Sequence, residues 1–180
     1  MNDPARLSDW GSFYVIVGSS GGALIGIQFV VITLIAGMRR RTEGAVAAFA
    51  TPTVVHFAGA LLVSAIMSAP WAALSRPALA LATCGVIGIA YAVVVIRRAR
   101  RQTDYRPVWQ DWLWYLTLPC VAYVALSLAA LLLRSHAEAA LDVIAAAALG
   151  LLLVGVHNAW DSVTHLVLHA DDEEPTDRTE

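Results

Sequence analysis

Polar and ionisable side chains gather in one stretch near the end of the chain, GVHNAWDSVTHLV, whose surroundings are apolar. His157, Asp161 and His165 recur every four residues, so on a helix they share one face. A carboxylate beside two imidazoles can accept and release a proton, because histidine ordinarily changes its charge near neutral pH. These three residues are therefore the first candidates for chemistry.

The composition indicates what surrounds them. Of 180 residues, 58% are hydrophobic and only 14% are charged, whereas a soluble domain has about 45–50% apolar and about 25% charged residues. Both values are typical of a membrane protein, so we expect the lipid bilayer as the main partner. The formal net charge of −2 excludes a nucleic-acid-binding protein.

Five apolar segments predict an all-α, polytopic transmembrane bundle. Each is close to or above the roughly 20 residues that a helix needs to cross a bilayer. The segments span about residues 13–37, 45–69, 78–96, 112–133 and 139–168. We expect one transmembrane domain over residues 1–168, followed by an acidic tail over 169–180 that is solvated, or else docks onto the arginine-rich loops.

The arginines predict the orientation. All 12 basic residues are arginines, and nine of them follow the first or third segment or lie in the tail. The positive-inside rule then places the N-terminus outside and the C-terminus in the cytoplasm, in a bacterial inner membrane. Tryptophans support these boundaries, since they favour membrane interfaces. We assign Trp10 and Trp71 to the outer interface and Trp109, Trp112 and Trp114 to the cytoplasmic one.

Several other polar side chains are predicted to lie at similar depths in the membrane. Measured from the cytoplasmic ends of their segments, Gln28 lies about 15 Å deep, His56 about 16 Å and His157 about 17 Å. No arginine or lysine lies inside a segment, so Asp161 needs a histidine, a tyrosine, water or a proton as its partner. The candidates for an inner-half ion or proton pathway are Gln28, His56, Tyr115, His157, Asp161 and His165.

These side chains have a second interpretation, in which they only hold the bundle together. Hydrogen bonds between membrane helices contribute about 0.6 kcal/mol each on average. Gln28 and Asn158 favour this structural interpretation. For His157 and Asp161, a structural role and a functional role are equally well supported by the sequence.

Two further patterns concern packing. Gly18, Gly22 and Gly26 form a double GxxxG ladder, which lets helices approach closely within the bundle or against a second copy. We therefore expect a homo-oligomer. Pro119 lies inside the fourth segment and leaves the carbonyl of Tyr115 without its helical donor, which predicts a kink there.

The stretches FYVIVGSSGGALIGIQFVVITL and GVHNAWDSVTHLV resemble segments of small, uncharacterised multi-span bacterial inner-membrane proteins. The resemblance covers about a quarter of the chain. It implies a location in the inner membrane, and it carries over no site residue, cofactor or substrate.

Three functions follow from these observations. The first is a channel or transporter that passes a proton or small ion. The second is a regulatory or assembly partner of another membrane complex, acting through the glycine ladder and the charged loops. The third is a redox protein with His56 and His157 as axial ligands of haem or a metal. The sequence contains no HExxH motif, phosphate loop or histidine box, which disfavours an enzyme and names no cofactor.

Overall fold

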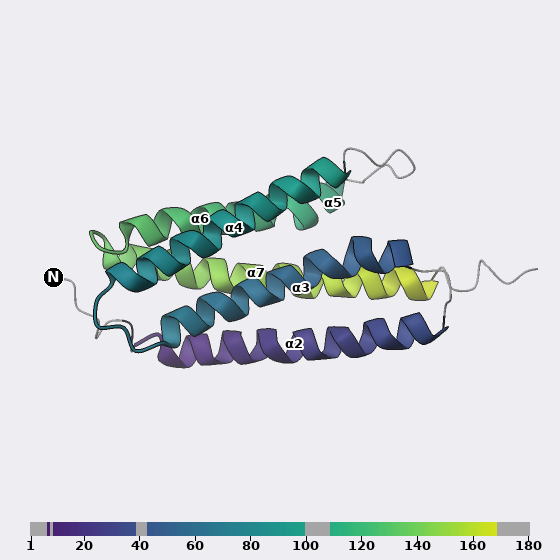
Figure 1. The fold of residues 1–180 in the computed structure, drawn as a ribbon, viewed down its shortest axis with the longest axis horizontal. Coiled ribbons are helices and arrows are strands. Elements are labelled where there is room, and N and C mark those ends of the chain that lie inside the picture. Colours follow the sequence, from purple (N-terminus) through teal and green to yellow (C-terminus); the bar gives the residue numbers. More distant parts are fainter. Residues whose placement is uncertain (1–6, 8, 39–42, 100–108, 169–180) are drawn as a thin grey trace, which may run out of the picture.

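The computed structural model describes residues 7, 9–38, 43–99 and 109–168, and describes only the backbone of 35–38, 43–51, 98–99, 110–111 and 165–168. Every regular element in these ranges is helical, which confirms the all-α prediction for the described part of the chain (Figure 1). The elements are α2 (Gly11–Met38), α3 (Glu43–Ser68), α4 (Ser75–Ala99), α5 (Trp109–Trp112), η1 (Leu113–Thr117), α6 (Leu118–Leu132) and α7 (Ala137–Leu168).

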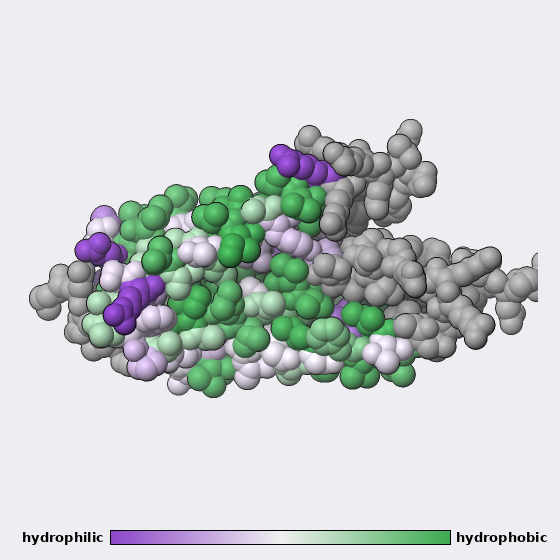
Figure 2. Space-filling view, viewed as in Figure 1, coloured by the Kyte–Doolittle hydropathy of each residue, from purple (hydrophilic) through white to green (hydrophobic). Residues whose placement is uncertain are grey.

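The helices have the length and composition of membrane spans. Four stretches are long and apolar enough to cross a bilayer, namely Gly11–Leu34, Ser75–Arg97, Leu113–Leu132 and Ala137–Thr164. Helix α3 adds the shorter apolar stretch Pro52–Ser68. Large apolar side chains also face outward, such as Leu79 and Leu131, each 71% exposed. Figure 2 shows hydrophobic residues over most of the described middle of one face. This architecture is that of an integral membrane protein.

The helices stack in three layers, with α2 on one side, α3 and α7 in the middle, and α4 and α6 on the other side (Figure 1). Along the series of long helices α2, α3, α4, α6 and α7, each runs antiparallel to the one before, and α5 and η1 lead directly into α6. We call one end of the bundle the α5 end. At this end α2 and α4 finish, α3 begins, and the short helix α5 is found. Toward this end, α4 and α5 diverge from α3 (Figure 1).

Glycines set the spacing between α2 and α3. A Cβ atom added at Gly18 would lie 2.9 Å from Cβ of Ser64, and one at Gly21 would lie 3.1 Å from the carbonyl oxygen of Phe57. Gly22 and Gly26, by contrast, are exposed and have no neighbour within 4 Å. Within the described chain the close contacts thus follow Gly18 and Gly21, and packing of Gly22 and Gly26 against a second copy stays a prediction.

Glycines also bring the other layers together. Gly85 and Gly88 of α4 lie directly against Ser127 and the ring of Tyr123 on α6. A Cβ atom added at Gly155 of α7 would lie 2.5 Å from the ring of Phe57. The polar residues at mid-depth are therefore held between closely packed backbones.

Near Tyr115, where the sequence predicts a kink, the helix contains the π-helical segment η1. The N–H of Leu118 donates to the carbonyl of Leu113, five residues earlier, and Thr117 Oγ1 donates to the carbonyl of Trp112 at 3.0 Å. Pro119 follows directly and is buried. Because proline supplies no N–H, the usual bond to Tyr115 cannot form, and a wider turn accommodates its ring.

Candidate functional site

The carboxylate of Asp161 has a tyrosine as its partner. Tyr115 Oη donates a hydrogen bond of 3.0 Å to Asp161 Oδ2, joining η1 to α7. The two residues are 46 positions apart in the chain. One of the partners that the sequence allowed for Asp161 is thus present, and it comes from the π-helical segment.

One turn away on α7, the imidazole of His157 stacks on Trp114. The ring centroids lie 3.8 Å apart and the planes differ by 5°. Consecutive residues of η1, Trp114 and Tyr115, therefore contact His157 and Asp161, which are four residues apart on α7. We call these four residues the Asp161 cluster.

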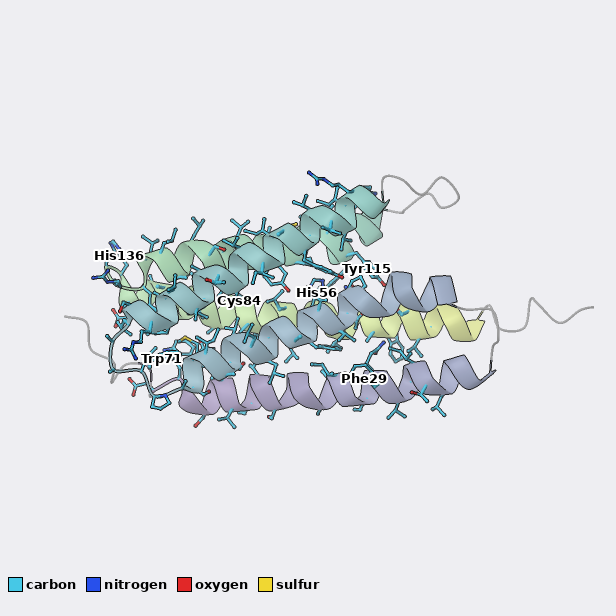
Figure 3. The ribbon with its side chains drawn as sticks, viewed as in Figure 1. Phe29, His56, Trp71, Cys84, Tyr115 and His136 are labelled. Atoms are coloured by element: carbon cyan, nitrogen blue, oxygen red, sulfur yellow. The ribbon has the colours of Figure 1, made fainter. Side chains whose placement is uncertain are left out.

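The Asp161 cluster lies in the half of the bundle nearer the α5 end and is partly open. Asp161 is exposed, while Trp114, Tyr115 and His157 are half-buried. Figure 3 shows Tyr115 on the side of α7 that faces the α4–α6 layer. The cluster thus brings one carboxylate, one phenol and one imidazole together between η1 and α7.

A second pair lies deeper, between α3 and α6. Nδ1 of His56 lies 3.3 Å from the hydroxyl of Tyr123, and the histidine tautomer decides which atom donates. His56 is 3% and Tyr123 2% exposed. Gly59 of α3 and Gly88 of α4 leave the room that the tyrosine occupies. Figure 3 shows His56 on the same side of the middle layer as Tyr115.

Gln28 belongs to a different group. It is 6% exposed on α2, and Thr53 and Asn158 are fully buried on α3 and α7. Gln28 lies two turns beyond Gly21, whose neighbours on antiparallel α3 are Phe57 and Leu61, so it is level with Thr53. These three buried polar residues thus lie at a similar level of α2, α3 and α7.

Two residues that contact the site are not among the residues predicted for it. The sequence predicts Trp114 at the membrane interface, whereas its ring stacks on His157, and Tyr123 is absent from the predicted pathway. Tyr123 lies eight residues after Tyr115, a spacing that puts both on a similar face of a helix, and this signal could have identified it. The side chain of His165, the loop arginines over 39–41 and 100–106 and the acidic tail lie outside the described residues.

The two histidines do not fit as axial haem ligands. His56 and His157 come from α3 and α7, whose backbones pack together where Phe57 contacts Gly155. A porphyrin ring needs far more separation between the helices that ligate its two faces. The described residues also contain no group of three or more His, Cys, Asp or Glu arranged for a metal ion.

Comparison of the chain with protein-family models, with curated proteins and with solved structures found no match in any of the three.

Proposed function

We propose that this membrane protein transports protons and that the Asp161 cluster is its proton-binding site. The hydrogen bond between Tyr115 and Asp161, beside the stack of Trp114 on His157, carries this proposal. An ionisable side chain within a membrane span is expensive, and it commonly marks an ion or proton pathway. Here the hydrogen bond of the carboxylate comes from a phenol, which is a neutral donor, so Asp161 and Tyr115 together form a compact site that suits a proton.

The chemistry of the described side chains favours a proton over a metal cation. A hard cation is usually held by several oxygen ligands with more than one carboxylate, and the Asp161 cluster supplies one carboxylate, one phenol and one imidazole. These groups exchange protons readily. A proton is thus the small ion that best suits the cluster.

The arginines of the sequence give the pathway its direction. Arg97 and Arg98 lie in the last turn of α4, and the arginines over 39–41 and 100–106 follow the ends of α2 and α4 in the sequence, at the α5 end. By the positive-inside rule this end faces the cytoplasm of a bacterial inner membrane. Asp161 would then receive its proton from, or release it to, the cytoplasm.

The other half of the bundle favours a transporter over an open pore. Beyond His56 and Tyr123 its centre is filled by buried apolar side chains, including Val63, Met67, Leu126, Leu133 and Ile144. In this conformation the pathway stops at mid-depth. Transport across the membrane therefore requires a second conformation that opens the apolar half, as in alternating access.

Proton uptake into liposomes tests the proposal. The purified protein is reconstituted with a pH-sensitive dye inside, and a potassium gradient with valinomycin sets the driving voltage. We expect a proton flux above that of empty liposomes, and we expect Asp161→Asn to reduce it to the empty-liposome level. Asp142→Asn is the matched control, because Asp142 is an exposed carboxylate on the same helix.

The variants must first elute as folded protein with the helical content of the wild type. Wild-type flux at the level of empty liposomes, with voltage of either sign, would end the proposal. Equal losses in Asp161→Asn and Asp142→Asn would show that the cluster has no special role.

A second candidate function is that of an assembly partner in a larger membrane complex. The outward-facing small side chains of α2, including Gly22 and Gly26, favour it because they leave a helix face on which another helix can pack closely. Cross-linking in bilayers would test it. Replacing both glycines by leucine should abolish the cross-linked species, whereas Gly150→Leu should retain it.

A further inference from the structure

Three side chains at mid-depth carry buried polar atoms without a hydrogen-bond partner. These atoms are Nε2 of His56, Nδ1 of His157, and both Oδ1 and Nδ2 of Asn158. His56 is 3% exposed and Asn158 is fully buried. An unpaired polar group costs several kcal/mol in an apolar environment, so three such groups together require an explanation.

The three residues lie at a similar level of α3 and α7, near the place where these helices pack together. Phe57, the residue after His56, packs against Gly155 of α7. His157 and Asn158 follow Gly155 by less than one turn. Because α3 and α7 run antiparallel, Asn158 is level with the turn of α3 that precedes Phe57. The unpaired atoms thus belong to residues at one level of the bundle.

The types of these atoms indicate what binds them. Asn158 offers a carbonyl that accepts and an amide that donates, and each histidine nitrogen does either, depending on its tautomer. A cation would satisfy the acceptors and would be repelled by the amide N–H groups. Water donates and accepts at once, and a buried water typically forms about three hydrogen bonds to such groups.

We propose that water molecules bind between α3 and α7 and bridge Nε2 of His56, the amide of Asn158 and Nδ1 of His157. This inference rests on the proposed function in one respect only: the waters extend the proton pathway from the Asp161 cluster to His56. Asn158 is then a positioning residue that holds the waters in place.

The proton balance of this extension is simple. A proton bound at Nδ1 of His157 passes to the nearest water, and each oxygen releases one proton as it receives another. The last proton binds Nε2 of His56, which becomes an imidazolium and donates Nδ1–H to Tyr123 Oη. The titratable group in contact with this endpoint is Tyr123 on α6, and Tyr91 and Cys84 of α4 lie near that tyrosine. His157 and Asp161 are the titratable groups of α7 at nearby levels.

Solid-state NMR tests the water site directly. Protein labelled with ¹⁵N-histidine is embedded in bilayers, and the transfer of magnetisation from water protons to the ring nitrogens is measured. The chain has five histidines, so His56→Gln identifies the His56 signals by their loss. We expect His56 to receive magnetisation from water although it is buried, and exposed His136 serves as the reference.

Two variants sharpen the test. Asn158→Leu has a similar volume without the amide, and we expect it to lose the water transfer at His56. Ser64→Ala removes another buried unpaired group, at the α2–α3 contact, and should leave the transfer unchanged. The wild-type measurement decides the matter even if Asn158→Leu fails to fold.

The outcomes separate this inference from the proposed function. Absence of water transfer at wild-type His56 would overturn the water site, while a proton flux that depends on Asp161 would still stand. Water transfer at His56 without any proton flux would support the site and refute the transporter.

Discussion

Tyr115 Oη, in the π-helical segment η1, lies 3.0 Å from Asp161 Oδ2 on α7. The preceding residue of the same segment, Trp114, covers His157 at a centroid distance of 3.8 Å. The carboxylate and the imidazole of α7 are thus each held by one residue of η1.

Removing the phenol hydroxyl should impair proton transfer and leave the fold in place. Tyr115→Phe retains the ring and deletes the donor to Asp161, so the carboxylate loses its orientation. We expect a proton flux several-fold lower and a loss of about 0.6 kcal/mol in stability, the usual scale of such bonds in membranes. Flux assays and unfolding in mixed micelles measure the two effects.

Tyr14→Phe is the matched control for this variant. The hydroxyl of Tyr14 is buried and has no hydrogen-bond partner, so its removal should leave the flux unchanged and the stability equal or higher. A Tyr115→Phe variant with wild-type flux would mean that the hydrogen bond has no part in transport.

The stack on Trp114 should be visible in the spectrum of His157. An indole ring parallel to the imidazole at 3.8 Å shields its ring protons and shifts their resonances upfield. Trp114→Leu should remove the shift and cost about 0.5–1.5 kcal/mol of stability. Trp160→Leu, at a side chain that is 74% exposed, should change neither. An unshifted His157 resonance in the wild type would contradict the stack.

The sequence predicted much of this architecture but little of its pairing. Helical segments follow from apolar runs, because the bilayer admits few other solutions. The partner of Asp161 did not follow, because it depends on which helices are neighbours and on how η1 is wound. Pro119 indicated a disturbance near Tyr115, yet whether a helix bends or takes in an extra residue depends on packing. Gly21 is not part of the GxxxG ladder, yet it contacts α3, because the way in which α2 and α3 cross determines which face of α2 packs against α3.

Replacing Pro119 should change both the winding of η1 and the proton flux. Pro119→Ala supplies an N–H that can donate to the carbonyl of Tyr115 and favours a regular α-helix. Such a helix turns Trp114 and Tyr115 away from His157 and Asp161. We therefore expect lower flux together with loss of the upfield shift of His157. Leu118→Ala, one residue earlier, is the control and should retain the shift; equal spectra for Pro119→Ala and wild type would refute the coupling.

The close contact of α4 with α6 should tolerate no added methyl group. A Cβ atom at Gly88 would overlap the ring of Tyr123, so Gly88→Ala should displace the ring and cost about 1–3 kcal/mol. Gly22→Ala meets nothing within 4 Å and should be neutral or stabilising by up to about 1 kcal/mol. Thermal unfolding in detergent measures both, and equal stabilities would contradict the packing.

A double-mutant cycle in proton flux tests the central claim, that Tyr115 and Asp161 act as one proton-binding unit. Flux is measured in liposomes for the wild type, Tyr115→Phe, Asp161→Asn and the double variant. If Tyr115 acts through Asp161, Asp161→Asn abolishes the flux and Tyr115→Phe changes nothing further in that background. Flux that persists in Asp161→Asn, and falls by the same factor on adding Tyr115→Phe as in the wild type, would contradict the account.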